Sequence, residues 1–246
     1  MLKQSPIKGI LSAGILTLAV LAIFLIGPSG AFAAKLDANK VPKTGVKTTD
    51  FIPAGWSLEV QTKDDVNADG TPDFLMTLME DKPANLKEDE FFEKDRALLI
   101  ILRDEAGKLT LGAVGARVLQ CGACGGAFYG VVEAPASVEV GNTGTIVIGR
   151  ESGSNTVSES TMTFRWDAAA KKFQLIGYDY AYRDRTNGDY SVESINYSTG
   201  DRTVKEGKGK KETSKKTKVA TKTKMYLDSV DYEKLDEEAN KRLGLD

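Results

Sequence analysis

Oxygen-bearing side chains occur at every second position between residues 65 and 73, with Gly70 placed to allow a sharp bend. Calcium takes about six to eight oxygen ligands, and an alternating Asp-x-Asn-x-Asp loop turns three side chains toward one centre. The pattern predicts a Ca²⁺ site that uses one backbone carbonyl, at its threonine, and four side chains: Asp65, Asn67, Asp69, Thr71 and Asp73. The alternative is an Asn/Asp/Gly turn that needs no ion.

The residues around this loop argue against a helical calcium-binding hand. Such a hand closes its ligand shell with a glutamate at the twelfth position, where this chain has Met76. Apolar and polar residues alternate on both sides of the loop, which predicts flanking strands. The segment therefore resembles the DxNxDGxxD loops of FG-GAP/VCBS repeats, in which a β-hairpin carries the ion. The missing ligand predicts modest affinity and a structural role.

A second distinctive stretch is the Cys-x-x-Cys turn formed by Cys121 and Cys124, which glycines follow at positions 125 and 126. In an exported protein this spacing predicts a local disulfide. A redox-active pair is the alternative. It is disfavoured because paired glycines start a helix poorly, and an activated cysteine usually lies at a helix N-terminus.

Composition excludes several kinds of chemistry. The 246 residues include no histidine, which removes Ser-His-Asp and Cys-His catalysis and histidine-bound metals. Two cysteines cannot form a four-thiolate zinc site, so we expect any metal to have oxygen ligands. No catalytic constellation stands out, so a non-enzymatic domain is favoured and a carboxylate-based hydrolase is the alternative.

The first 33 residues have the form of a signal peptide. Lys3 and Lys8 precede an uncharged apolar run, and small residues stand before a cleavage point after Ala33. A retained membrane anchor is the alternative, because the run approaches the length of a span. Cleavage predicts a periplasmic or secreted protein with no membrane span. It also removes two of 33 basic residues and none of 35 acidic ones, and this near-balance argues against a nucleic-acid partner.

The remaining chain predicts a mainly β fold of antiparallel hairpins, arranged as a twisted sheet, a sandwich or a propeller-like domain, with a short C-terminal α-helix. The six-residue apolar run 97–102 suits a central strand covered on both faces. The alternation around Trp56 predicts a half-buried strand. We expect a flexible lead-in at 34–50, a β-rich domain at 51–204, a Lys-rich edge hairpin or linker at 205–225, and a helical segment at 226–246.

Aromatic and basic residues gather on one predicted strand and suggest a contact surface. The residues are Tyr178, Tyr180, Tyr182, Arg183 and Arg185. The alternative is that the three tyrosines form one structural face of the strand, because they recur with a period of two.

The order of motifs over residues 51–204 resembles a family of uncharacterised exported bacterial proteins. The motifs are FIPxGW at 51–56, the calcium-like loop, the apolar strand, CxxCGG at 121–126, TxTFRW at 161–166, FxLIGY at 173–178 and NYSTG at 196–200. The resemblance implies no known activity. We expect a domain that binds an envelope component, a polysaccharide or a protein, with a thiol–disulfide protein as a further alternative.

Overall fold

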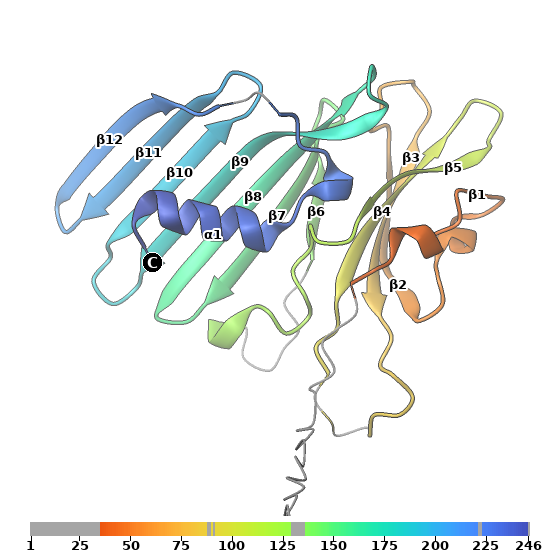
Figure 1. Cartoon of the computed structure of the whole chain (residues 1–246), viewed down its shortest axis with the longest axis horizontal. Coiled ribbons are helices and arrows are strands. Elements are labelled where there is room, and N and C mark those ends of the chain that lie inside the picture. Colours follow the sequence, from red (N-terminus) through yellow and green to blue (C-terminus); the bar gives the residue numbers. More distant parts are fainter. Residues whose placement is uncertain (1–34, 88–89, 91, 129–135, 221–222, 246) are drawn as a thin grey trace, which may run out of the picture. The chain divides into compact units, whose positions relative to one another are not determined.

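The computed structural model describes residues 35–87, 90, 92–128, 136–220 and 223–245. Twelve strands form two antiparallel sheets, and one α-helix follows them near the C-terminus (Figure 1), which confirms the mainly β fold with a short C-terminal helix. The strands are β1 (Thr44–Gly45), β2 (Trp56–Asp64), β3 (Asp73–Glu80), β4 (Arg96–Arg103), β5 (Leu109–Gly115), β6 (Ser137–Val140), β7 (Ile146–Gly153), β8 (Thr156–Asp167), β9 (Lys172–Asp184), β10 (Tyr190–Asn196), β11 (Asp201–Lys208) and β12 (Lys211–Lys218). The helices are η1 (Ala38–Lys40), η2 (Thr48–Phe51), η3 (Gly126–Phe128) and η4 (Leu227–Ser229), which are 3₁₀ helices, and α1 (Tyr232–Leu243).

Strand β4 lies at the centre of the five-stranded sheet, whose order is β1-β5-β4-β3-β2. Residues 97–101 are all 0% exposed, so the strand predicted to be covered on both faces is confirmed. Successive side chains of a strand point to opposite faces. Leu98 and Ile100 accordingly join a core cluster that also contains residues of the seven-stranded sheet, whereas Leu99 and Ile101 join a separate cluster. One core cluster therefore lies between the two sheets, and the other lies on the opposite face of the five-stranded sheet.

The prediction that β2 is half-buried is wrong. Leu58 is 41% exposed and Val60 is 48% exposed, because β2 is the edge strand of its sheet and is exposed along most of its length. The pairing with β3 shifts register between these two residues, which marks a bulge around Glu59. The bulge directs Glu59 toward Arg96, whose side chain is only 2% exposed. Two nitrogens of Arg96 donate to the Glu59 carboxylate, at distances between 2.7 and 3.1 Å.

The segment 34–50 is packed against the fold over the residues described, so the prediction of a flexible lead-in is also wrong. Leu36 and Val41 are 5% and 2% exposed and belong to the second core cluster. Helices η1 and η2 and the short strand β1 occupy this segment, and β1 pairs with β5. Two apolar side chains among polar neighbours carry no periodic pattern, which is why the sequence did not reveal this packing.

The seven strands of the second sheet follow chain order, from β6 at one edge to β12 at the other. Strands β11 and β12 form a hairpin that ends in the lysine-rich edge strand. This edge strand covers residues 211–218, within the Lys-rich segment 205–225 for which a hairpin or a linker was expected. An edge strand with exposed lysines resists pairing with another chain.

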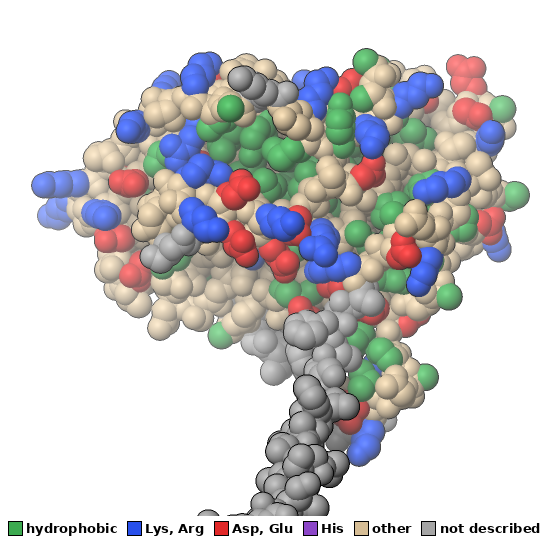
Figure 2. Space-filling view, viewed as in Figure 1, with side chains coloured by type: hydrophobic (Ala, Val, Ile, Leu, Met, Phe, Trp, Pro, Cys, Tyr) green, Lys and Arg blue, Asp and Glu red, His purple; other side chains and the backbone are tan. Residues whose placement is uncertain are grey.

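Helix α1 lies across one face of the seven-stranded sheet (Figure 1). It begins after Asp231, whose carboxylate accepts a hydrogen bond from the amide of Glu233, and it ends at Gly244 in a left-handed conformation. Its buried residues recur at helical spacing: Tyr232, Leu235, Asp236 and Ala239. Charged side chains gather along its exposed surface (Figure 2). In the described part of the chain, the helices are too short or too polar to cross a membrane.

Candidate functional site

A polar pocket of about 480 Å³ lies between α1 and the seven-stranded sheet. Its size falls in the range of about 300–1,000 Å³ that is usual for ligand sites. Strands β7, β8 and β9 contribute one residue each, α1 contributes five, and the cysteine turn contributes Cys124. The lining residues are Cys124, Arg150, Ser158, Tyr180, Tyr232, Glu233, Asp236, Glu237 and Asn240.

The strand residues beneath α1 form a polar row because of the sheet register. Arg150 pairs with Ser160, Ser160 with Tyr180, and Tyr180 with Glu193. Directly paired residues of antiparallel strands lie on the same face. The row therefore presents a cation, a hydroxyl, a phenol and a carboxylate to α1, which covers this face.

Tyrosines connect the sheet to the helix through hydrogen bonds. The hydroxyl of Tyr178 donates to Asp236 Oδ1 at 2.7 Å, and that of Tyr180 donates to Asn240 Oδ1 at 2.7 Å. Burial raises the pKa of both tyrosines, so their hydroxyls keep their protons and act as donors at neutral pH.

Arg150 holds a central position in the pocket. Its guanidinium forms an ion pair with Asp236, and its Cζ lies 4.8 Å from the ring centre of Tyr232. The Nε of Arg150 and the Oγ of Ser160 are buried and have no hydrogen-bond partner among the described residues. Buried polar atoms in folded proteins usually have a partner. Hydrogen-bonding groups near this ion pair therefore remain without a partner among the described residues.

A buried carboxylate of the sheet, that of Glu193, binds the C-terminal end of α1. Glu193 of β10 is 0% exposed and accepts hydrogen bonds from Arg242 of α1 and from Arg202 of β11. The closest contacts are 2.5 Å for Arg202 and 2.6 Å for Arg242. One buried acid thus ties two strands and the helix together, which keeps the helical wall of the pocket in place.

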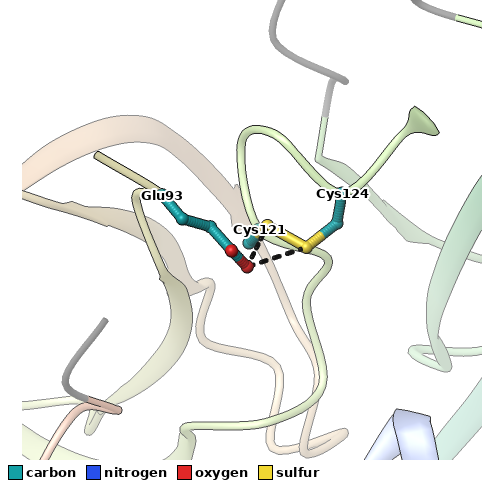
Figure 3. Close-up of side chains that lie close together, drawn as sticks. All are labelled: Glu93, Cys121 and Cys124. Carbon is teal, nitrogen blue, oxygen red and sulfur yellow. Dashed lines mark hydrogen bonds between the residues drawn. A yellow bond between two sulfur atoms is a disulfide. The ribbon is translucent and has the colours of Figure 1, made fainter. Parts of the chain in front are cut away.

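The predicted pairing of Cys121 with Cys124 is a disulfide in the structure. Figure 3 shows that the carboxylate of Glu93 points at both sulfur atoms. Its Oε1 lies 2.9 Å from Cys121 Sγ and 3.2 Å from Cys124 Sγ. In the described part of the chain, these three residues are the one group of acidic or sulfur ligands in which at least three ligand atoms lie within 4.8 Å of one another.

Three hydrogen bonds hold this cluster where the two sheets approach each other. The amide of Gly122 donates to the carbonyl of Lys94 at 2.9 Å, which places the cysteine turn beside the residue that follows Glu93. On the other side, the amide of Gly153 donates to the carbonyl of Gly125 at 3.2 Å. Gln120 Nε2 donates to the carbonyl of Glu151 at 3.1 Å. Sequence reasoning found the cysteines but missed Glu93, because only the fold brings residue 93 to the turn.

The 65–73 loop joins β2 to β3 and closes on itself through its own side chains. Asp65 accepts hydrogen bonds from the amides of Ala68 and Gly70, at 2.8 and 2.9 Å. Asn67 accepts from the amide of Asp69, and Asp69 accepts from the amide of Thr71. A pocket of about 430 Å³ lies beside the loop, between Asp64, Asp65 and Ala68 on one side and residues 140–144 on the other.

Asp73 stands apart from the other predicted ligands. It is 0% exposed, and its two oxygens accept hydrogen bonds from the amides of Val66 and Arg103. Burial raises the pKa of this carboxyl to about 6, although the two amide bonds act in the opposite direction. Its hydrogen bonds therefore join the 65–73 loop to the neighbouring strand β4.

The residues predicted to form an aromatic contact surface are divided between the two faces of the sheet. Tyr178 and Tyr180 are 0% and 2% exposed beneath α1, and Tyr182 is partly buried against the same core, which agrees with the alternative that the three tyrosines are one structural face of a strand. Arg183 lies on the opposite face, where its Nε is 3.3 Å from Glu159. Arg185 follows the strand, and its amide donates to the carbonyl of Asn155. These residues therefore do not form a single exposed surface.

Comparisons with protein-family models, curated proteins and solved structures find no match to this chain. The resemblance to an exported bacterial family therefore stays a prediction.

Proposed function

We propose that this chain is an exported, non-enzymatic binding domain, and that the pocket under α1 receives a polyhydroxylated ligand such as a sugar of an envelope polysaccharide. The single observation that carries the proposal is the combination of two tyrosine rings with an arginine whose buried Nε has no hydrogen-bond partner among the described residues, all lining a pocket of about 480 Å³. Sites of this kind fix a ligand with a few placed polar groups and exclude water with aromatic surfaces.

The charges of the pocket narrow the ligand class. Arg150 is the one cation among its lining residues and is already paired with Asp236, whereas Glu233 and Glu237 add two further carboxylates. An acidic ligand would meet like charges. The pocket therefore favours neutral or amino sugars over uronic acids.

The test is calorimetric binding of the full mature chain to oligosaccharides of neutral, amino and acidic sugars. Tyr180→Phe removes one hydroxyl at almost unchanged volume, and we expect it to weaken binding about fivefold, the equivalent of about 1 kcal/mol for one hydrogen bond. Tyr190→Phe is the matched control, since the hydroxyl of Tyr190 donates to Glu212 and neither residue lines the pocket. Absence of binding by all three sugar classes, or equal loss in both variants, would contradict the proposal. Release of new reducing ends would favour the hydrolase alternative instead.

We further propose that Ca²⁺ binds the 65–73 loop through Asp65, Asn67 and Asp69. The donor chemistry fits a hard cation, because all three supply oxygen and each carboxylate keeps lone pairs beyond those used by the loop amides. Asp73 is excluded from direct ligation in this proposal because, unlike the other three residues, it is 0% exposed, and its carboxylate joins the amides of Val66 in the loop and Arg103 on β4. When bound, the ion would neutralise a loop that carries several carboxylates.

Thermal unfolding with calcium and with a chelator tests this second proposal. At 100 times the dissociation constant, an ion that binds only the folded state adds about 2.7 kcal/mol to the free energy of unfolding. Asp65→Asn should abolish this gain. Asp104→Asn, which alters an acid in the turn between β4 and β5, should retain it. A melting temperature that is equal with calcium and with chelator would end the calcium proposal.

A further inference from the structure

The contact between Glu93 and the two cysteines lacks a chemical reason while the cysteines are oxidised. A disulfide sulfur carries no proton, so it cannot donate to the carboxylate that lies 2.9 and 3.2 Å from the two sulfur atoms. A carboxylate held against sulfur lone pairs gains little. Two thiols or a metal ion at the same place would each give Glu93 a partner.

We propose that the reduced form of this cluster is a binding site for a borderline-soft divalent cation of the Zn²⁺ class, with Cys121, Cys124 and Glu93 as ligands. Zinc is bound by thiolate sulfur and carboxylate oxygen, commonly in a tetrahedral arrangement. The Cys-x-x-Cys spacing is that of zinc sites, and the fold adds a third ligand from the segment that precedes β4. The expectation that any metal here must be held by oxygen alone is therefore replaced by a mixed sulfur and oxygen site.

Three protein ligands leave a fourth position open, as in zinc sites that hold water or a small ligand. Cys124 lines the polar pocket under α1, so the cluster adjoins a space of about 480 Å³. Glu93 is exposed and Cys124 is partly exposed, which lets an ion enter without opening the core. The hydrogen bond from the amide of Gly122 to the carbonyl of Lys94 does not involve the sulfur atoms, so it can hold Glu93 beside the turn after the disulfide is reduced.

The disulfide and the metal exclude each other. Reduction by an external dithiol adds two electrons and two protons to the S–S bond and gives two thiols, while the dithiol is oxidised to its own disulfide. Cation binding then releases the two thiol protons, because thiolates are the ligands. The same four-residue turn would thus be a covalent clip in an oxidising environment and a metal site in a reducing one.

Cobalt titration of the full mature chain tests the proposal. The protein is reduced with a phosphine under nitrogen and titrated with Co²⁺, and thiolate-to-cobalt charge-transfer absorption is recorded before Zn²⁺ is added to displace the cobalt. We expect saturable binding of one ion per chain in the reduced protein and no charge-transfer absorption in the oxidised protein. Absence of the band in reduced protein that still shows its native near-ultraviolet circular dichroism would overturn the proposal.

Variants decide whether Glu93 is a ligand. Glu93→Gln should weaken cobalt binding at least about 10-fold, because even outer partners of a metal site contribute about 10–100-fold to affinity. Glu90→Gln is the matched control, since this acid lies in the same segment and accepts from the amide of Lys87 instead. Equal affinities in the two variants would remove Glu93 from the site. Cys124→Ser should abolish the charge-transfer band or reduce it to that of one thiolate, and an unchanged band would also overturn the proposal.

Discussion

Replacement of Glu193 by glutamine tests how α1 is held on the sheet. Glu193 is 0% exposed, and its carboxylate accepts from Arg202, whose side chain is 16% exposed, and from Arg242, whose side chain is 28% exposed. Glutamine keeps the shape and one acceptor oxygen but removes the charge, so both guanidinium groups lose the buried carboxylate that neutralises them. Breaking a buried ion pair from one side typically costs about 3–5 kcal/mol. Because Arg242 keeps some contact with water, we expect the lower end, about 3 kcal/mol.

Urea unfolding measures this loss, with the slope m checked for constancy so that the change in midpoint reports stability. In a domain of this size about 3 kcal/mol corresponds to a fall in melting temperature of about 6–12 °C. Glu238→Gln is the control, because Glu238 contacts the same Arg242 at 3.4 Å but is 64% exposed. Exposed pairs of this kind contribute about 0.3–0.5 kcal/mol. If Glu193→Gln loses no more stability than Glu238→Gln, then the buried carboxylate does not anchor the helix and the reasoning fails.

Three further predictions concern the core, the turn and the loop. Ile100→Ala should lower the free energy of unfolding by about 2–5 kcal/mol, whereas Val60→Ala on the exposed edge strand should change it by less than about 0.5 kcal/mol, both measured in urea. Reduction of the disulfide should cost less than about 3 kcal/mol, because the closed loop spans few residues, and a larger loss would show that the turn supports more than itself. Asp73 has a pKa of about 6 in the folded chain against 3.8 ordinarily, so the folded state holds a proton between those values that the unfolded state has released. The free energy of unfolding should therefore fall as the pH rises from about 4 to about 6, by at most about 3 kcal/mol. Asp73→Asn should lack this pH-dependent component when measured in chelator.

Local patterns predicted the elements that depend on near neighbours in the chain. The apolar run at 97–102 is long enough for a strand and too short for a typical helix, and its position between charges identified β4. The helix expected within 226–246 forms over residues 232–243, and Asp231 and Gly244 cap its two ends. Alternation failed at Leu58 and Val60, since an exposed edge strand and a half-buried strand share the same period and differ only in what covers them.

In the candidate sites, too, contacts between near neighbours were predictable from the sequence and contacts between distant residues were not. The two cysteines lie close enough in sequence that their pairing depends on one turn. Glu93 joins them from 28 residues away in the chain. The tyrosines at 178 and 180 were visible as a face of a strand, but their partners on α1 lie 58 and 60 residues further on.

By itself, the sequence determined the β-rich class, the presence of a short C-terminal helix, the local disulfide pair and the concentration of oxygen ligands at 65–73. Each of these depends on backbone preference or on residues within one turn of each other. The tertiary structure decided that Asp73 lies buried inside the hairpin, that Glu193 holds the helix, and that Glu93 meets the cysteines. Such placements depend on which distant segments approach one another. That choice minimises exposed apolar surface and buried charge over the whole chain, so no short window of sequence contains it.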